Sequence, residues 1–242
     1  MIGYNPRDFE NPLRKVCFEM TLFKNSLIKL FKSRMIIPLL VSLTLNNAVY
    51  FLSRLWTTGK PHITLESSLD DMIPVIPFMT VIYFGSFVFW TINYCIVGLR
   101  DRSEAFTILS ANVVAKLVCL LFFTFFPTTN IRPDVTGTDV FSEMLLFLYS
   151  IDPADNLLPS IHCLESRFCV MAIRRNDSIP KWYKVMSHVL CGLICISTLT
   201  TKQHVIIDVF AGLFLADIAY LLAKKLNLSK YYGNMYSRIV KQ

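Results

Sequence analysis

Long apolar runs are the feature that most constrains what this chain can fold into. A helix needs roughly 20 apolar residues to cross a hydrocarbon core of about 30 Å, and several runs in this 242-residue sequence reach that length. We therefore expect an all-α, polytopic membrane protein, built as a six-transmembrane-helix bundle. The expected spans are residues 35–56, 78–99, 106–126, 159–174, 185–201 and 204–223.

The composition supports a membrane protein and excludes several other classes. The chain is 54% hydrophobic and 17% charged, whereas soluble domains carry about 25% charged residues. Its seven cysteines fall mostly inside the apolar runs and show no paired spacing in a loop. This pattern indicates neither a disulfide framework nor a zinc site. No acidic cluster suggests another metal, so we expect no metal and no cofactor.

The distribution of basic residues predicts the orientation. The N-terminal segment and alternate loops are rich in Lys and Arg, while the opposite side carries only Arg54, Lys60, Arg132 and Lys202. Because positive residues stay on the cytoplasmic side, both termini are expected there. The net charge of +7 then indicates contact with anionic membrane lipids and not with nucleic acid. We expect a multi-pass protein of the cell (plasma) membrane, and the sequence leaves its oligomeric state open.

Three segments are expected along the chain. Residues 1–34 form a cytoplasmic amphipathic N-terminal segment, in which residues 16–34 interleave Phe, Leu and Ile with Lys at helical spacing. That spacing favours either an amphipathic helix lying in the membrane interface or an ordinary cytoplasmic helix packed on the spans. Residues 35–224 form the membrane domain, and residues 225–242 form a basic cytoplasmic tail.

Two polar motifs lie where expected spans begin. His204 and Asp208 are four residues apart, so a helix places them on one face, where the carboxylate can orient the imidazole. The pair can also simply satisfy two polar groups at a helix start. Pro159-Ser160-Ile161-His162 opens another span, and the free amides of a helix start attract anions. The alternative for this motif is a plain helix cap followed by an interfacial histidine.

Three cations accompany these motifs. Arg132 follows the third span and can offer a planar fork of donors to phosphate, or can anchor the span by reaching the headgroups. Lys202 lies two residues before His204 and is a second candidate for phosphate binding. Lys116 and Asp217 fall inside spans, where ionisable groups are costly and usually paired. We hypothesise an ion pair between them.

Together, Arg132-Pro133, Pro159-Ser160…His162 and Ser197…His204…Asp208 resemble the motifs of the type 2 phosphatidic acid phosphatase superfamily of lipid phosphate phosphatases and phosphotransferases. The pattern looks nearer to the branch with the inositol phosphorylceramide synthases, and it covers about residues 78–223. The resemblance implies an integral-membrane hydrolase that acts on a phosphomonoester or diphosphate lipid at the outer face, through a phosphohistidine intermediate.

The resemblance also implies the role of each site residue. His204 is the expected nucleophile, Asp208 orients it, and His162 is the proton donor. Phosphate binding is expected from Arg132, Lys202 and Ser160. The expected partners are a lipid phosphate substrate and membrane lipids.

Two departures from the motifs keep other functions open. Phe125 and Thr198 stand where the superfamily has a lysine and an arginine, which motivates a catalytically silent lipid-binding homologue. A lipid headgroup phosphotransferase shares the same first half-reaction as the phosphatase. Lys116 and Asp217 inside the membrane motivate a transporter, although no paired broken helices support one.

Overall fold

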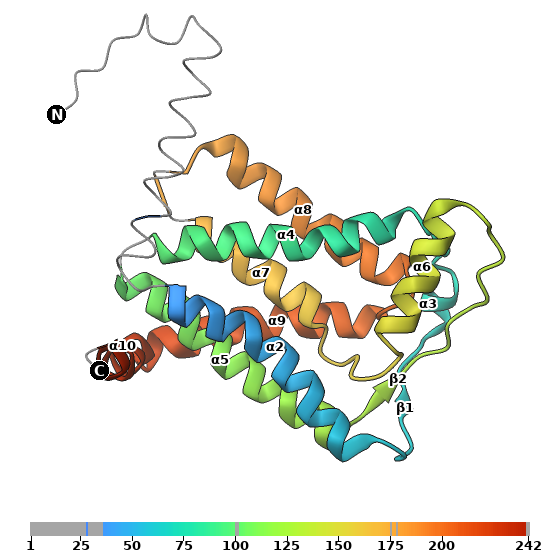
Figure 1. The fold of residues 1–242 in the computed structure, drawn as a ribbon, viewed down its shortest axis with the longest axis horizontal. Helices are drawn as coiled ribbons and strands as arrows, with labels where there is room; N and C mark the ends of the chain where they lie inside the picture. The colour runs from blue at the N-terminus through green and yellow to red at the C-terminus, as the bar shows by residue number, and fades with distance from the viewer. Residues whose placement is uncertain (1–27, 29–35, 100–101, 175, 178, 241–242) are drawn as a thin grey trace, which may run out of the picture.

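The computed structural model describes residues 28, 36–99, 102–174, 176–177 and 179–240, and it is almost entirely helical (Figure 1). Two residue pairs, Ile63–Thr128 and Thr64–Thr129, form a short parallel ladder between loops. The expected all-α class is therefore confirmed. The elements are α2 (Ile36–Thr57), β1 (Ile63–Thr64), α3 (Ser68–Asp71), α4 (Met79–Gly98), α5 (Arg102–Phe125), β2 (Thr128–Thr129), α6 (Val140–Ile151), α7 (Ile161–Arg174), α8 (Lys181–Thr200), α9 (Ile206–Lys225) and α10 (Leu228–Val240).

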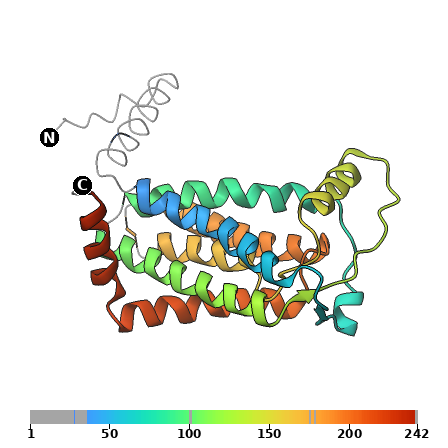
Figure 2. The same ribbon diagram turned by 60° about the horizontal axis from the view of Figure 1, so that its bottom comes forward.

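Helices α2, α4, α5, α7, α8 and α9 run along a common direction, with α7 at the centre (Figure 1). Helix α7 packs against α4, α5, α8 and α9, while α2 packs mainly on α5. The small elements α3, α6, β1 and β2 gather at one end of this bundle, and α10 crosses the other end (Figures 1 and 2). The loops that precede α4, α7 and α9 thus meet at the end that holds α6, and this end carries the candidate site.

Four of the described helices, α4, α5, α8 and α9, are long and apolar enough to cross a membrane. The protein is thus a multi-pass helical membrane protein. Helix α7 has 14 residues, a length of about 21 Å at 1.5 Å per residue, which is shorter than a bilayer core. Helix α2 has 22 residues. Neither α2 nor α7, both expected as spans, is among these four helices.

The segment expected as an N-terminal interfacial helix, residues 16–34, lies outside the described residues apart from Ile28. Helix α10 covers most of the segment expected as a basic tail. It packs on α5 through Phe106, whose ring centroid lies 5.6 Å from that of Tyr232 and 5.4 Å from that of Tyr236. An aromatic contact therefore holds this helix against the end of the bundle.

A buried polar network centred on Glu165 joins four helices. Lys116 Nζ lies 2.6 Å from Glu165 Oε1, and both side chains are almost fully buried. Asn112 donates a hydrogen bond to the same carboxylate oxygen at 2.8 Å, and Tyr94 donates to the other. Ser42 on α2 donates to Asn112 at 2.8 Å. A charge removed from water is tolerated only when it is paired and hydrogen-bonded, so the network favours one arrangement of α2, α4, α5 and α7.

The expected ion pair between Lys116 and Asp217 is wrong. Asp217 instead accepts hydrogen bonds from Arg167, with Nη2 at 2.9 Å from Oδ1, on the half-exposed side of α7 and α9. Position along a span predicts depth in the membrane but not the direction in which a side chain points around its helix. Lys116 therefore has the depth of Asp217 but points toward Glu165.

We predict strong coupling between Lys116 and Glu165. Lys116→Met should destabilise the protein by about 3–5 kcal/mol, because it leaves a buried carboxylate without its partner. Lys116→Met combined with Glu165→Leu should cost clearly less than the sum of the single substitutions. Unfolding of the purified protein in detergent, measured as a double-mutant cycle, checks this.

The Arg167–Asp217 pair is the matched control, because its side chains are 27% and 40% exposed. Its coupling should be smaller than that of Lys116 and Glu165, because its two side chains are less buried. Additive effects of the Lys116 and Glu165 substitutions would contradict the role given to the network.

Candidate functional site

The starts of α7 and α9 lie against each other at the end of the bundle that holds α6. The Ser160 amide donates to the Asp208 carbonyl at 3.0 Å, directly before α7 begins. Gly212, one turn further along α9, has no side chain, and a Cβ there would overlap the Ser160 carbonyl. This close approach brings the rings of His162 and His204 to a centroid separation of 6.3 Å. The two expected site histidines are therefore neighbours, although 42 positions separate them in the sequence.

His204 and Asp208 form the contact that their spacing predicts. His204 Nδ1 lies 3.4 Å from Asp208 Oδ2, and both side chains are buried. The same carboxylate oxygen accepts the Val205 amide at 3.0 Å. The carboxylate thus satisfies a free amide at the start of α9 and also faces the imidazole.

His162 lies among aromatic rings. Its ring stacks on Tyr83 with centroids 4.1 Å apart, and Trp90 and Phe87 follow at 5.0 and 5.8 Å. The side chain is 6% exposed. Neither ring nitrogen of His162 has a hydrogen-bond partner among the described residues. A buried polar group without a partner is costly, so these two nitrogens are the most conspicuous unmet polar atoms of the site.

The three residues expected to bind phosphate contact the protein itself. Arg132 donates to the Asp152 carbonyl at 2.6 Å and to Gln203 Oε1 at 2.7 Å. Lys202 Nζ donates to the Asp70 carbonyl at 2.8 Å, and Ser160 is fully buried. Within the described chain, none of the hydrogen bonds of Arg132 and Lys202 reaches His162 or His204. The structure thus brings the two histidines together but uses both cations to hold loops.

Asp70, a residue that the sequence analysis did not single out, connects the loop after α2 to the start of α9. Its carboxylate accepts the Ile206 amide at 2.7 Å and both the amide and the hydroxyl of Ser67. Burial disfavours the charged form, but the hydrogen bonds from Ser67 and Ile206, together with the nearby Lys202, outweigh it and lower the pKa of Asp70. The ionised carboxylate therefore stabilises the layer of loops beside His204.

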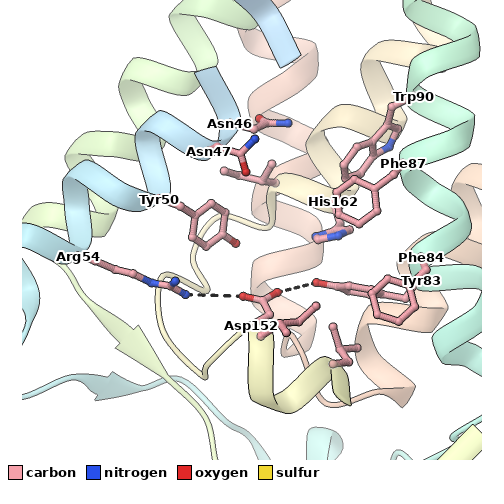
Figure 3. Close-up of a pocket in the computed structure, with 13 residues that line it drawn as sticks. Asn46, Asn47, Tyr50, Arg54, Tyr83, Phe84, Phe87, Trp90, Asp152 and His162 are labelled. Atoms are coloured by element: carbon pink, nitrogen blue, oxygen red, sulfur yellow. Dashed lines mark hydrogen bonds and ion pairs between the residues drawn. The ribbon is translucent and has the colours of Figure 1, made fainter. Parts of the chain in front are cut away.

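A cavity of about 290 Å³ opens beside His162, between α2, α4, α6 and α7 (Figure 3). Sequence reasoning missed it, although two signals were present: an Asn46-Asn47 pair inside an apolar run, and aromatic residues 83, 87 and 90 at helical spacing on one face. The polar and aromatic residues lining it are Asn46, Asn47, Tyr50, Arg54, Tyr83, Phe84, Phe87, Trp90, Asp152 and His162.

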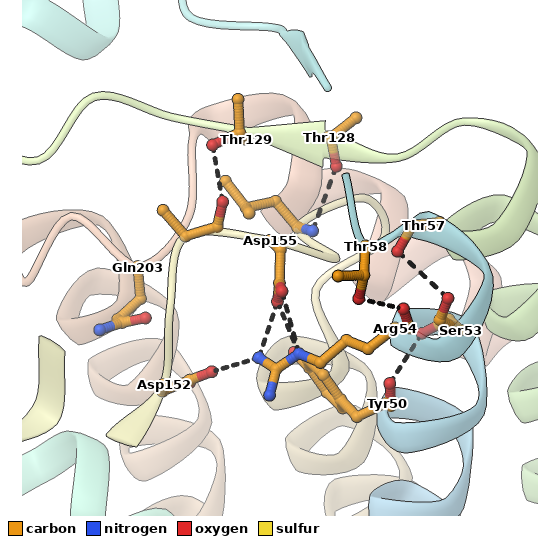
Figure 4. A network of polar contacts seen from close by, with 12 residues as sticks. Tyr50, Ser53, Arg54, Thr57, Thr58, Thr128, Thr129, Asp152, Asp155 and Gln203 are labelled. Atoms are coloured by element: carbon orange, nitrogen blue, oxygen red, sulfur yellow. Dashed lines mark hydrogen bonds and ion pairs between the residues drawn. The ribbon is translucent and has the colours of Figure 1, made fainter. Parts of the chain in front are cut away.

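Arg54 lines one side of this cavity (Figure 3), and its polar contacts are drawn in Figure 4. Its guanidinium donates from Nε and Nη2 to Asp155, with Nη2 at 2.7 Å from Oδ1, and it lies 3.7 Å from Asp152. Asp152 also accepts the Tyr83 hydroxyl at 2.9 Å. Thr129 donates to the Ala154 carbonyl at 2.6 Å. These contacts hold the end of α2 and the β2 loop against the segment between α6 and α7.

One family model matches the sequence: dolichol-phosphate mannosyltransferase subunit 3, over residues 35–116. The matched stretch covers α2, β1, α3, α4 and the first half of α5, about a third of the chain. No curated protein and no solved structure gives a match.

This match overturns the resemblance to the type 2 phosphatidic acid phosphatase superfamily, because the family found is a different one. The functional expectations that followed from this resemblance were therefore wrong. They were the lipid phosphatase or phosphotransferase activity, the silent lipid-binding alternative, the lipid phosphate substrate, and the assignments to hydrolases and phospholipid metabolism. Those expectations relied on three short motifs between Arg132 and Asp208, all outside the matched stretch. Arg132 and Lys202 moreover lie bound to carbonyl groups of the chain. The individual roles given to His204, Asp208, His162 and Ser160 stay predictions.

We predict that Gly212→Ala destabilises the protein by about 1–3 kcal/mol, as overpacking does elsewhere. The added methyl group would push α9 away from Ser160. Gly192→Ala on α8 is the control, because a Cβ there meets no atom within 4 Å. Denaturant unfolding in detergent checks both variants; equal stability of the two would contradict the close approach.

We predict a pH-dependent contribution from Asp70. Because its folded-state pKa is lowered, the stabilisation is complete above the ordinary carboxyl range and is lost as the pH falls through the folded pKa. Asp70→Asn should cost about 1 kcal/mol near neutral pH, because an amide has one acceptor oxygen, whereas the two carboxylate oxygens accept from Ile206 and Ser67. It should also flatten the acid limb of a plot of unfolding temperature against pH.

Asp71→Asn is the matched control, because Asp71 is exposed and should leave the profile unchanged. An unaltered acid limb in Asp70→Asn would contradict the assignment.

Proposed function

We propose that this protein is a membrane-embedded subunit of a dolichol-phosphate mannosyltransferase complex, in which residues 35–116 contact another subunit. The match of this stretch to the family model of subunit 3 is the observation that carries the proposal. The function follows from association inside the membrane and needs no chemistry from this chain.

The structure of the matched stretch supports such a contact. Helix α2 packs on α5 with one face and presents large apolar side chains on the other. Phe51 is 67% exposed and Leu55 is 65% exposed, one helical turn apart. Side chains of this kind face either lipid or another helix in a membrane, and helix association there depends on close packing. This outer face of α2 is therefore the contact surface that we assign to the partner subunit.

We also propose that α2 and α7 lie at membrane depth, giving six helices in the bilayer. Helix α7 is covered by α4, α5, α8 and α9, so Glu165 faces protein and not lipid. Polar groups are tolerated at this depth when they are buried in protein. Of the polar residues of α2 that line the cavity, Asn46 and Arg54 are partly buried, whereas Asn47 is exposed.

The basic residues then place both termini on the cytoplasmic side, with residues 16–34 along that face of the membrane. The loop layer, α6 and the cavity lie on the opposite side. We further propose that the membrane concerned is the one that holds the mannosyltransferase, in place of the cell membrane expected from the sequence.

Copurification tests the proposed contact. Phe51→Ala combined with Leu55→Ala should reduce the amount of mannosyltransferase catalytic subunit recovered with this chain in mild detergent by about tenfold. Two large side chains at the centre of an interface commonly supply this much binding energy. The readout is quantitative mass spectrometry of the purified complex.

The matched control uses α8, outside the family match. Val185→Ala combined with Val189→Ala changes two side chains that are 63% and 55% exposed and also one turn apart, and it should leave the recovery unchanged. No catalytic subunit recovered with the unaltered chain, or equal losses in both double variants, would refute the proposal.

A further inference from the structure

The cavity beside His162 carries polar atoms that no residue of the described chain satisfies. Both ring nitrogens of His162 and the side-chain oxygen of Asn46 are buried there without a hydrogen-bond partner. His162 lies at the start of α7, and Asn46 and Asn47 come from α2 on the other side (Figure 3). Because native structures rarely leave such groups unmet, these atoms point to a ligand that can both donate and accept hydrogen bonds.

Aromatic rings from α4 and α2 line the rest of the cavity. Phe87 and Trp90 follow one face of α4, Tyr50 on α2 lies across the cavity, and the Tyr83 ring is stacked on His162 (Figure 3). The face of an aromatic ring carries negative charge density, which attracts the polarised C–H groups of a saturated ring that bears hydroxyls. The Trp90 indole N–H already donates to Ser166 at 3.0 Å, so its ring offers a flat surface and not a donor.

The charges around the cavity offset one another. Arg54 is paired with Asp155 and lies 3.7 Å from Asp152. Asp152 accepts the Tyr83 hydroxyl, and its carbonyl binds Arg132. Two arginines and two aspartates are thus engaged with one another or with neighbouring groups, so no charge of the lining is left over for an anion or a cation. This balance disfavours a phosphate, which needs unpaired donors of positive charge. It equally disfavours a quaternary ammonium group, which would need an open aromatic cage, since His162 already covers the Tyr83 ring.

From the unmet polar atoms, the aromatic wall and the balanced charge, we propose that this cavity binds one neutral sugar ring, such as the hexosyl head group of a glycolipid. Its volume of about 290 Å³ lies just below the range of about 300–1,000 Å³ typical of small-molecule sites, which favours a single sugar ring over a disaccharide. Neutral His162 can supply one donor or one acceptor to a hydroxyl, and Asn46 accepts a further hydrogen bond. The inference stands apart from the proposed subunit function, because it concerns the isolated chain.

The test uses the full chain in nanodiscs of sugar-free phosphatidylcholine. Trp56→Phe and Trp182→Phe leave Trp90, in the cavity wall, as the single tryptophan of the three. Methyl α-mannopyranoside should change the Trp90 fluorescence saturably, whereas choline chloride, sodium phosphate and sucrose should not. Asn46→Ala should weaken the apparent affinity about three- to tenfold, as the loss of one hydrogen bond does, and His162→Asn should weaken it further.

Two controls separate binding from general effects. His188→Ala alters an exposed histidine on α8 and should leave the titration unchanged. Asn46→Ala removes an oxygen that has no partner, so its unfolding temperature should equal that of the parent even if His162→Asn is unstable. A sucrose response as large as that of the mannoside, saturation by choline or phosphate, or an unchanged affinity in Asn46→Ala would overturn the proposal.

Discussion

The carboxylate of Glu165 is the contact on which the arrangement of this bundle depends. It lies on the short central helix α7. There it pairs with Lys116 and accepts hydrogen bonds from Asn112 and Tyr94. Each partner comes from α4 or α5, and Ser42 extends the network to α2. Since an unpaired charge at this depth is strongly unfavourable, α7 can keep its position only while the neighbouring helices keep theirs.

The end of the bundle that holds α6 is arranged around this network. Gly212 allows the start of α7 to lie directly against α9, and this contact sets His162 beside His204. Loops then cover the end through contacts that use carbonyl groups as acceptors, from Arg132 and Lys202. The result is a polar, closed layer on one side of the histidines and an open cavity on the other, toward α2 and α4.

The sequence predicted the helices well, because runs of apolar residues and their polar ends mark helix bounds directly. The expected span 204–223 became α9, Ile206–Lys225, and the neighbourhood of His162 and His204 followed from two helix starts on one side of the membrane. Contacts between remote segments were not predictable in this way. The partner of Lys116, the use of Arg132 within the loop layer and the cavity wall supplied by Asn46 all depend on directions around helices. The family assignment failed for a related reason: three short motifs define an order of residue types, which unrelated membrane proteins can share.

Residues 35–116 are proposed to associate with another subunit and the cavity to bind a neutral ligand; the association is the central claim. A structure of this protein bound to a dolichol-phosphate mannosyltransferase, determined by electron cryo-microscopy in a lipid nanodisc, tests that claim most directly. We expect the enzyme to lie against the outer face of α2 and the adjoining part of α4. A complex held only through α8 and α9, or particles that contain this chain alone in the presence of excess enzyme, would contradict the account.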